Sequence, residues 1–257
     1  MTFLFTLIAC LLFTAYGGLI VAYRRAWTAI PWFEPQQRPA TTKITVLVPA
    51  RNEEAVITAC LSSLARQSYS RDRYEVIVLD DHSTDKTAAM VRDFASLPEA
   101  GGLALRCLPM SDVLPPAELR AHKKFAIETG VGAATGELIV TTDADCYFHP
   151  DWLLTLAACY EERGARFIAA PVRIGAAGKD AEARHRSLLG VFQTLDFITL
   201  QGITGAAVHS RFHSMCNGAN LAYTREAFYE AGGFKGIDHI PSGDDMFLMH
   251  KIRALYP

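Results

Sequence analysis

The sequence predicts an α/β fold with a mostly parallel central sheet, preceded by one membrane-spanning helix. Three observations predict it. The first 23 residues carry no charged side chain. From Lys43 onward, apolar runs typical of strands alternate with segments of helical periodicity. Acidic residues directly follow several of these runs, and the carboxyl ends of parallel strands are where open α/β sheets bind ligands.

The uncharged segment, residues 1–23, is long enough to cross a hydrocarbon core of roughly 30 Å as a helix. Arg24 and Arg25 follow at once. By the positive-inside rule, they predict that the body of the protein is cytoplasmic, on the inner face of the cell membrane. A cleaved signal peptide is the alternative, but such peptides usually have a basic amino terminus and a short apolar core.

Residues 24–42 contain three prolines and two tryptophans without a period, and we expect a juxtamembrane linker there, with an ordinary surface loop as the alternative. The segment from residue 43 to 257 is expected to form one domain. Apolar runs predict strands at residues 44–48, 74–79, 103–108, 137–142 and 166–173. Helical spacing predicts helices at residues 53–67, 84–95, 123–134, 150–162 and 182–201, with another starting at Asp244.

Local signals support two of the helix starts. Ser83 or Thr84 can cap the second helix, and Pro150 suits a first helical position. The net charge of −2 gives no basic surface for nucleic acid. None of the six cysteines forms a Cys-x-x-Cys pair, so neither a zinc knuckle nor a disulfide framework is indicated, and a reducing compartment fits better.

Four motifs follow one another along the chain: Val48-Pro-Ala-Arg-Asn-Glu-Glu54, Val78-Leu-Asp-Asp-His-Ser-Thr-Asp85, Thr142-Asp-Ala-Asp145 and Gly243-Asp-Asp245. In this order and at these separations, they resemble the successive motifs of glycosyltransferase family 2. The resemblance covers roughly residues 43–257. It implies the GT-A nucleotide-sugar transferase fold and a reaction that inverts the anomeric configuration.

Asp143 and Asp145 resemble the D-x-D motif of that family. A nucleoside diphosphate gains negative charge as it leaves, and Mg²⁺ or Mn²⁺ held by carboxylate and phosphate oxygens stabilises that charge. The resemblance implies that Asp145 contacts the metal, and that Asp143 contacts the ribose or the metal shell. The alternative is a solvated turn after a strand.

The acidic pair Asp80-Asp81 follows the second predicted strand. The resemblance implies that Asp81 accepts a hydrogen bond from the nucleobase, most often from uracil N3–H. A charged acceptor suits this role because it makes stronger hydrogen bonds than a neutral one. In the alternative interpretation, Asp80 or Asp81 caps the helix expected near Thr84.

The resemblance also places the first strand-to-helix loop around the nucleoside, with the residues Pro49, Ala50, Arg51 and Glu53. Glu53 is expected near the ribose or base. Alternatively, Glu53 and Glu54 favour the positive end of the following helix, which is the interpretation we prefer for Glu54.

Lys123 matches the lysine of the family's G-K-x-x-A-L pattern, which points toward the nucleotide. His122 stands where glycine is common, so the approach of the backbone is expected to differ. The alternative for Lys123 is a solvated basic helix face.

Asp245 matches the catalytic base of the family, and Asp244 replaces a glutamate that is usual beside it. Both lie at a predicted helix start, where carboxylates are also common as simple caps. The segment Asn217-Gly-Ala-Asn220 resembles the one that lines the acceptor side. By contrast, His209, His213 and His239 lack metal-ligand spacing.

The resemblance therefore implies an inverting, metal-dependent glycosyltransferase at the cytoplasmic membrane face. Its donor would be a nucleotide sugar, a UDP-sugar by resemblance, and its acceptor a glycan or a lipid-linked hydroxyl. A nucleotidyltransferase is one alternative, although its usual Gly-rich basic loop is missing between residues 49 and 54. A truncated, non-catalytic nucleotide-sugar binder is the other. No Q-x-x-R-W motif, which processive members of the family usually carry, follows Asp245, so the chain is either a piece of a longer membrane enzyme or an unusually short member. We expect a piece, because the helix that starts at Asp244 ends without an evident cap or tail.

Overall fold

The computed structural model describes residues 1–36, 40–113, 121–175, 187–211 and 215–256. The chain forms two compact units. Unit one comprises Met1–Trp32 and Pro171–Met215, and unit two comprises Phe33–Ala170 and Cys216–Pro257.

Unit one contains two long helices, α1 (Thr2–Ala29) and α7 (Leu188–Ser210), which pack against each other. Helix α1 has 28 residues and a mean hydropathy of 2.2 over its most apolar stretch, so its length and composition suit a membrane span. It continues past Tyr23 to Ala29, so Arg24 and Arg25 are helical.

Helix α7 starts later than its predicted position and runs further, to Ser210; residues 182–186 of the predicted helix lie outside the described residues. Gly205 of α7 faces Trp27 of α1, where an added Cβ would come within 2.8 Å of the indole ring. The domain limits at residues 23 and 42 stay predictions.

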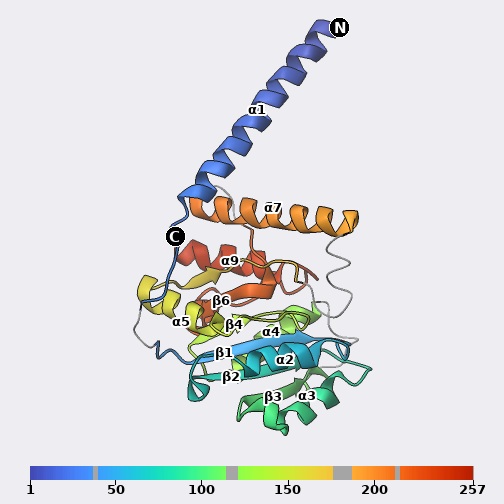
Figure 1. Cartoon of the computed structure of the whole chain (residues 1–257), viewed down its shortest axis with the longest axis vertical. Helices are drawn as coiled ribbons and strands as arrows, with labels where there is room; N and C mark the ends of the chain where they lie inside the picture. Colours follow the sequence, from blue (N-terminus) through green and yellow to red (C-terminus); the bar gives the residue numbers. More distant parts are fainter. Residues whose placement is uncertain (37–39, 114–120, 176–186, 212–214, 257) are drawn as a thin grey trace. The chain divides into compact units, whose positions relative to one another are not determined.

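Unit two is built on a six-stranded sheet in the order β3-β2-β1-β4-β6-β5 (Figure 1). The strands are β1 (Ile44–Ala50), β2 (Tyr74–Asp80), β3 (Ala104–Pro109), β4 (Leu138–Thr141), β5 (Phe167–Ala169) and β6 (Leu221–Thr224). The first four are parallel, and β6 runs antiparallel to both β4 and β5. The predicted mostly parallel sheet is confirmed, with β6 as a strand that the sequence analysis missed.

Helices cover both faces of this sheet. One core packs α2 (Ile57–Ala65), α3 (Thr87–Ala95) and α5 (Trp152–Arg163) against it. The other core packs α4 (His122–Ala133), α8 (Arg225–Glu230) and α9 (Asp244–Leu255) against the opposite face. Short 3-10 helices lie at Arg71–Arg73, Pro98–Ala100, Met110–Asp112 and Gly218–Asn220.

Successive side chains of β1 point to opposite faces of the sheet, and this explains why there are two cores. Val46 and Val48 point into the first core, while Leu47 between them points into the second. Strands buried on both faces are mostly apolar, and β1 is apolar except for the buried Thr45. Gly136 admits β4 beside β1, because a Cβ there would lie 2.5 Å from the backbone nitrogen of Thr45.

Several element limits differ from the prediction. Helices α2, α3 and α5 begin at Ile57, Thr87 and Trp152, each later than expected. The N-cap of α3 is Lys86, whose side chain makes no cap hydrogen bond; Asp85 Oδ1 accepts from the N–H of Thr87 instead, at 2.9 Å. Pro150 precedes the N-cap of α5, so it is not the first helical residue. Strand β5 covers only three residues, because its pairing with β6 ends there.

Candidate active site

The carboxyl ends of β1, β2 and β4 meet at one edge of the sheet. Ala50, the last residue of β1, lies opposite Asp80, the last residue of β2. The Asp81 N–H extends this pairing by donating to the Ala50 carbonyl at 2.8 Å. Strand β4 ends at Thr141, shortly before Asp143. The loops with the predicted site residues therefore leave neighbouring strands at the edge where such sheets bind ligands.

Two of the residues predicted in the first loop belong to the strand itself. Pro49 and Ala50 lie in β1, because its pairing with β2 continues to the Ala50–Asp80 pair. Arg51 is the first loop residue, and its guanidinium lies 3.8 Å from the Asp81 carboxylate. About half of the Arg51 side chain is exposed.

The loops after β1 and β2 are joined by reciprocal hydrogen bonds. The Asn52 N–H donates to Ser83 Oγ at 3.0 Å, and Asn52 Oδ1 accepts from the Thr84 N–H at 2.8 Å. Glu54 Oε2 accepts from the Lys86 N–H at 3.0 Å. Ser83 and Thr84 are thus engaged with the neighbouring loop, which explains why neither caps α3. The two loops form one hydrogen-bonded unit.

Glu53 and Glu54 lie outside the first turn of α2, which begins at Ile57. The prediction that Glu54 favours the positive end of this helix is wrong, because its carboxylate bonds to the loop after β2. Burial raises the pKa of Glu53, and the carboxylates of Asp145 and Asp143 raise it further. Glu53 therefore lies within electrostatic reach of the D-x-D pair.

Asp143 and Asp145 have different surroundings, although only the buried Ala144 separates them. Asp143 Oδ1 accepts a hydrogen bond from Lys123 Nζ at 2.7 Å. Asp145 is exposed. One carboxylate is therefore paired with a fixed ammonium group, and the other faces solvent.

Lys123, in the first turn of α4, links two acidic groups that are far apart in the sequence. Its Nζ lies 2.7 Å from Asp143 Oδ1 and 3.8 Å from Asp244 Oδ2. Burial lowers the pKa of Lys123, but the Asp244 and Asp143 carboxylates outweigh that effect, so the pKa is raised. The alternative of a solvated basic face does not describe a lysine held among carboxylates.

Asp245 is fixed by two backbone donors at the start of α9. Its Oδ2 accepts from the Gly218 N–H at 3.0 Å, and its Oδ1 accepts from the Met246 N–H at 2.7 Å. The bond to Met246 is local, whereas the bond to Gly218 ties α9 to the segment before β6. Asp245 is therefore more than a helix cap. Gly243, with φ of 76°, makes the turn into the helix.

Asp244 is the more enclosed member of this pair, with 15% of its side chain exposed. Burial raises the pKa of Asp244; Lys123 lowers it, and the neighbouring Asp245 raises it, so the net direction is upward. Asp244 and Asp143 thus flank the same ammonium group.

Lys124 positions the segment before α9, a role that the sequence analysis missed. Its side chain is buried, and Nζ donates to the carbonyls of Ile240 at 2.6 Å and Ser242 at 2.7 Å. Its spacing from Ile127 and Val131, three and seven residues on, places it on the buried face of α4. That spacing is the signal that distinguishes it from an exposed lysine.

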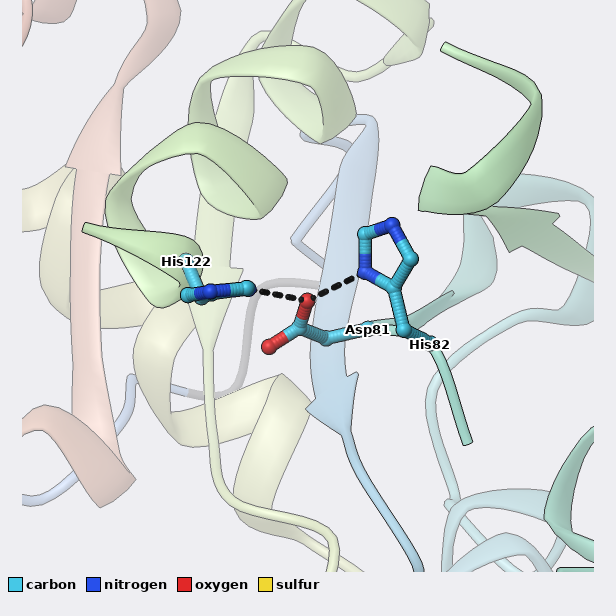
Figure 2. Close-up of side chains that lie close together, drawn as sticks. All are labelled: Asp81, His82 and His122. Carbon is cyan, nitrogen blue, oxygen red and sulfur yellow. Dashed lines mark hydrogen bonds and ion pairs between the residues drawn. The ribbon is translucent and has the colours of Figure 1, made fainter. Parts of the chain in front are cut away.

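Asp81 is buried and takes part in a cluster with two histidines (Figure 2). Asp81 Oδ1 lies 2.9 Å from Nδ1 of His82 and 3.0 Å from Nδ1 of His122. In the described part of the chain, these side chains form a group whose metal-ligating atoms all lie within 4.8 Å of one another. From the sequence, His122 stood out only as a replacement for glycine, and no pattern singled out His82.

Neither Asp80 nor Asp81 caps α3, since the N-cap position is Lys86 and the carboxylate that accepts from the N–H of Thr87, the first residue of α3, is that of Asp85. The capping alternative is therefore wrong for both. Asp80 is also buried, and its Oδ1 has no hydrogen-bond partner among the described residues.

Comparisons with known proteins agree with this geometry. The family model described as "Glycosyl transferase family 2" matches residues 45–230. The probable glycosyltransferase YdaM of Bacillus subtilis is 33% identical over 103 residues, covering 40% of this chain and 23% of that protein. A beta-monoglucosyldiacylglycerol synthase of Nostoc is 31% identical over 118 residues, covering 46% of this chain and 23% of that protein. The matched region thus spans about a quarter of either relative's length.

Solved structures share the fold. The mannosyltransferase PcManGT from Pyrobaculum calidifontis, in complex with GDP-Man and Mn²⁺, superposes with a TM-score of 0.65 and 28% identity. The match covers 92% of this chain and 60% of that one. TarS of S. aureus, residues 1–349 with UDP-GlcNAc, gives a TM-score of 0.51 at 18% identity, covering 82% of this chain and 53% of that one.

The predicted GT-A fold, with one apolar helix before it, is confirmed by these likenesses and by the sheet order. The family match includes β1, β2 and β4 and the loops at their carboxyl ends, and it covers most of the chain. This chain therefore belongs to glycosyl transferase family 2.

Proposed function

We propose that this chain is the catalytic part of an inverting, metal-dependent glycosyltransferase. It would move a sugar from a UDP-sugar to a hydroxyl of a glycan or lipid-linked acceptor. One observation carries the proposal: Asp143 after β4 and Asp244 at the start of α9 flank the single ammonium group of Lys123. This juxtaposition puts the D-x-D pair and the acidic pair of α9 in one site. Membership in the family and the names of its relatives support the same activity.

The donor set fits Mg²⁺ or Mn²⁺. Asp145 is exposed beside Asp143, and the crowding of carboxylates here contributes to the raised pKa of Glu53. Such an excess of oxygen ligands and negative charge is what these hard cations bind. Asp145, together with Asp143, would hold the ion, which when bound would stabilise negative charge on the departing diphosphate. The PcManGT complex with Mn²⁺ is in favour of this assignment.

Asp245 is the proposed general base. It would accept the proton of the acceptor hydroxyl while the oxygen attacks the anomeric carbon from the face opposite the diphosphate, which inverts the configuration. The backbone N–H groups of Gly218 and Met246 hold its carboxylate in one orientation. Lys123 would keep Asp244 and Asp143 in place beside the reacting groups.

The end of β1 and the loop after it would enclose the nucleoside, through Pro49, Ala50, Arg51 and Glu53. Asp81 would accept a hydrogen bond from the base. Two observations support this placement: Asp81 is buried at the sheet edge, and Glu53 lies within reach of the D-x-D carboxylates.

We further propose that α1 anchors the protein in the cell membrane, with the catalytic unit in the cytoplasm. Its apolar length supports this, as do Arg24 and Arg25 near its carboxyl end. Helix α7, which packs against α1, exposes apolar side chains including Leu188 and Phe192. A cleaved signal sequence is the competing interpretation of α1.

Replacement of Asp145 tests the metal assignment. Asp145→Ala is expected to lower the Mn²⁺-dependent affinity for UDP by roughly tenfold or more, because it removes an oxygen ligand. The fold should persist, since the side chain is exposed. Calorimetric titration of UDP with Mn²⁺ and with EDTA measures both effects. Asp93→Ala, which removes an equal charge from an exposed site on α3, is the control. Unchanged affinity in Asp145→Ala, or tight binding in EDTA, would contradict the assignment.

Replacement of Asp245 tests the general base. Asp245→Asn keeps the size of the side chain but removes its capacity to take a proton. The transfer rate is expected to fall by about two to four orders of magnitude, with little change in affinity for the UDP-sugar. Asp244→Asn is expected to be milder. If Asp245→Asn keeps near-normal turnover while Asp244→Asn is inactive, Asp244 is the general base and Asp245 is not. If both stay active, this acidic pair has no catalytic role.

Protease protection in right-side-out vesicles tests the topology. Protease added outside should leave the catalytic unit intact and should digest it after the vesicles are lysed. The mature chain should retain its first residues, because an anchor is not cleaved. Digestion in sealed vesicles, or a mature amino terminus within or after α1, would refute the proposed anchor.

A further inference from the structure

The two histidines beside Asp81 occupy one of its oxygens (Figure 2). His82 follows Asp81 in the loop after β2, and His122 is the first residue of α4. Both Nδ1 atoms lie within 3.0 Å of the same atom, Asp81 Oδ1. An ionised carboxylate can only accept, so both Nδ1 atoms must donate. The two lone pairs of Oδ1 are then in use.

The second oxygen of this carboxylate remains available to a ligand. Among the described residues, the Arg51 guanidinium lies 3.8 Å from Asp81 Oδ2, which is beyond hydrogen-bond distance. The Arg51 side chain is about half exposed, so it can move when a ligand enters. Asp81 therefore presents one acceptor atom where an unoccupied carboxylate would present two.

The backbone conformation of His82 points to a role for its ring. Its φ is 58°, in the left-handed region that glycine adopts without penalty. Histidine enters this region more readily than most residues, but still at a cost that a compensating interaction must offset. The hydrogen bond from Nδ1 to Asp81 is the interaction that glycine could not supply.

Nucleobases differ in how many donors they offer to a carboxylate. Guanine presents adjacent N1–H and N2–H donors, which match both oxygens of one carboxylate. Uracil presents a single N3–H between two carbonyls. If Oδ1 of Asp81 is taken, guanine must leave one donor unpaired, which weakens binding by roughly one to two orders of magnitude. The two histidine donors also shield Oδ1, which would otherwise repel a uracil carbonyl.

We infer that His82 and His122 are specificity residues that make Asp81 a single acceptor, selecting uracil over guanine in the donor nucleotide. The inference rests on the proposed function, in which Asp81 faces the base. The same three side chains also have the ligand types of a zinc site. Both Nδ1 atoms, however, lie at hydrogen-bond distance from one oxygen, and Arg51 adds positive charge nearby. We therefore treat metal binding by these three side chains as an alternative outcome of the experiment below.

Calorimetric titration of UDP and GDP, both with Mn²⁺, tests the inference on the full chain. The wild type should bind UDP at least tenfold more tightly than GDP. In the double variant His82→Gly/His122→Ala, this preference should fall by at least tenfold, since Oδ1 becomes free for the second guanine donor. Single His122→Ala should give a partial loss. His250→Ala, at an exposed histidine on α9, should keep the wild-type preference.

Thermal unfolding of each variant, with and without Zn²⁺, completes the experiment. The double variant should stay folded, because glycine suits the left-handed backbone at position 82. An unchanged UDP preference in a folded double variant overturns the inference and leaves the proposed function standing. A wild type that prefers GDP also overturns it, and a wild type that binds neither nucleotide refutes the proposed function itself. If Zn²⁺ stabilises only chains with both histidines while the UDP preference is unchanged, the cluster is a metal site instead.

Discussion

The placement of one ammonium group among several carboxylates is the constraint on which the site depends. Lys123 lies 2.7 Å from Asp143 and 3.8 Å from Asp244, which belong to segments far apart in the sequence. Without a cation between them, these carboxylates would repel one another at a partly buried edge of the sheet. Lys123 supplies a fixed positive charge between them, whereas Asp145, two residues after Asp143, is exposed and is the proposed ligand of a mobile cation.

The first turn of α4 organises the whole edge, because three consecutive residues reach three different parts of it. His122 bonds to Asp81, on the side proposed for the nucleobase. Lys123 pairs with the D-x-D carboxylate and with the acidic pair of α9. Lys124 is buried and holds the carbonyls of Ile240 and Ser242, just before that pair. A shift of this turn would therefore move together the groups proposed to bind the base, to hold the metal and to accept the proton.

Much of this arrangement could be predicted from the sequence, because it follows from strands and from what comes after them. Apolar runs located β1 and β2, and parallel pairing then required Asp81 and Asp143 to gather at one edge. The starts of α2 and α3 were predicted too early, because hydrogen bonds between the two preceding loops determine where these helices begin. Asn52 and Glu54 make such bonds to the loop after β2. Those bonds join residues about thirty positions apart, which local propensity does not detect.

The side-chain partners were harder to predict for the same reason. Lys124 and Lys123 are neighbours in the sequence, yet the first donates to backbone carbonyls and the second pairs with carboxylates. The helical period distinguishes them only once the buried face of α4 is known. His82 and His122 lie forty positions apart and meet only because α4 starts beside the loop after β2.

In the proposed function, the carboxylates around Lys123 hold the metal and accept the proton, while the cluster of Asp81, His82 and His122 recognises the base. Anomalous diffraction at the manganese edge, from crystals grown with UDP and Mn²⁺, tests it most directly. We expect one strong peak beside Asp145 and Asp143, with uracil against Asp81. A peak among Asp81, His82 and His122 instead, with none at the D-x-D pair, would contradict it.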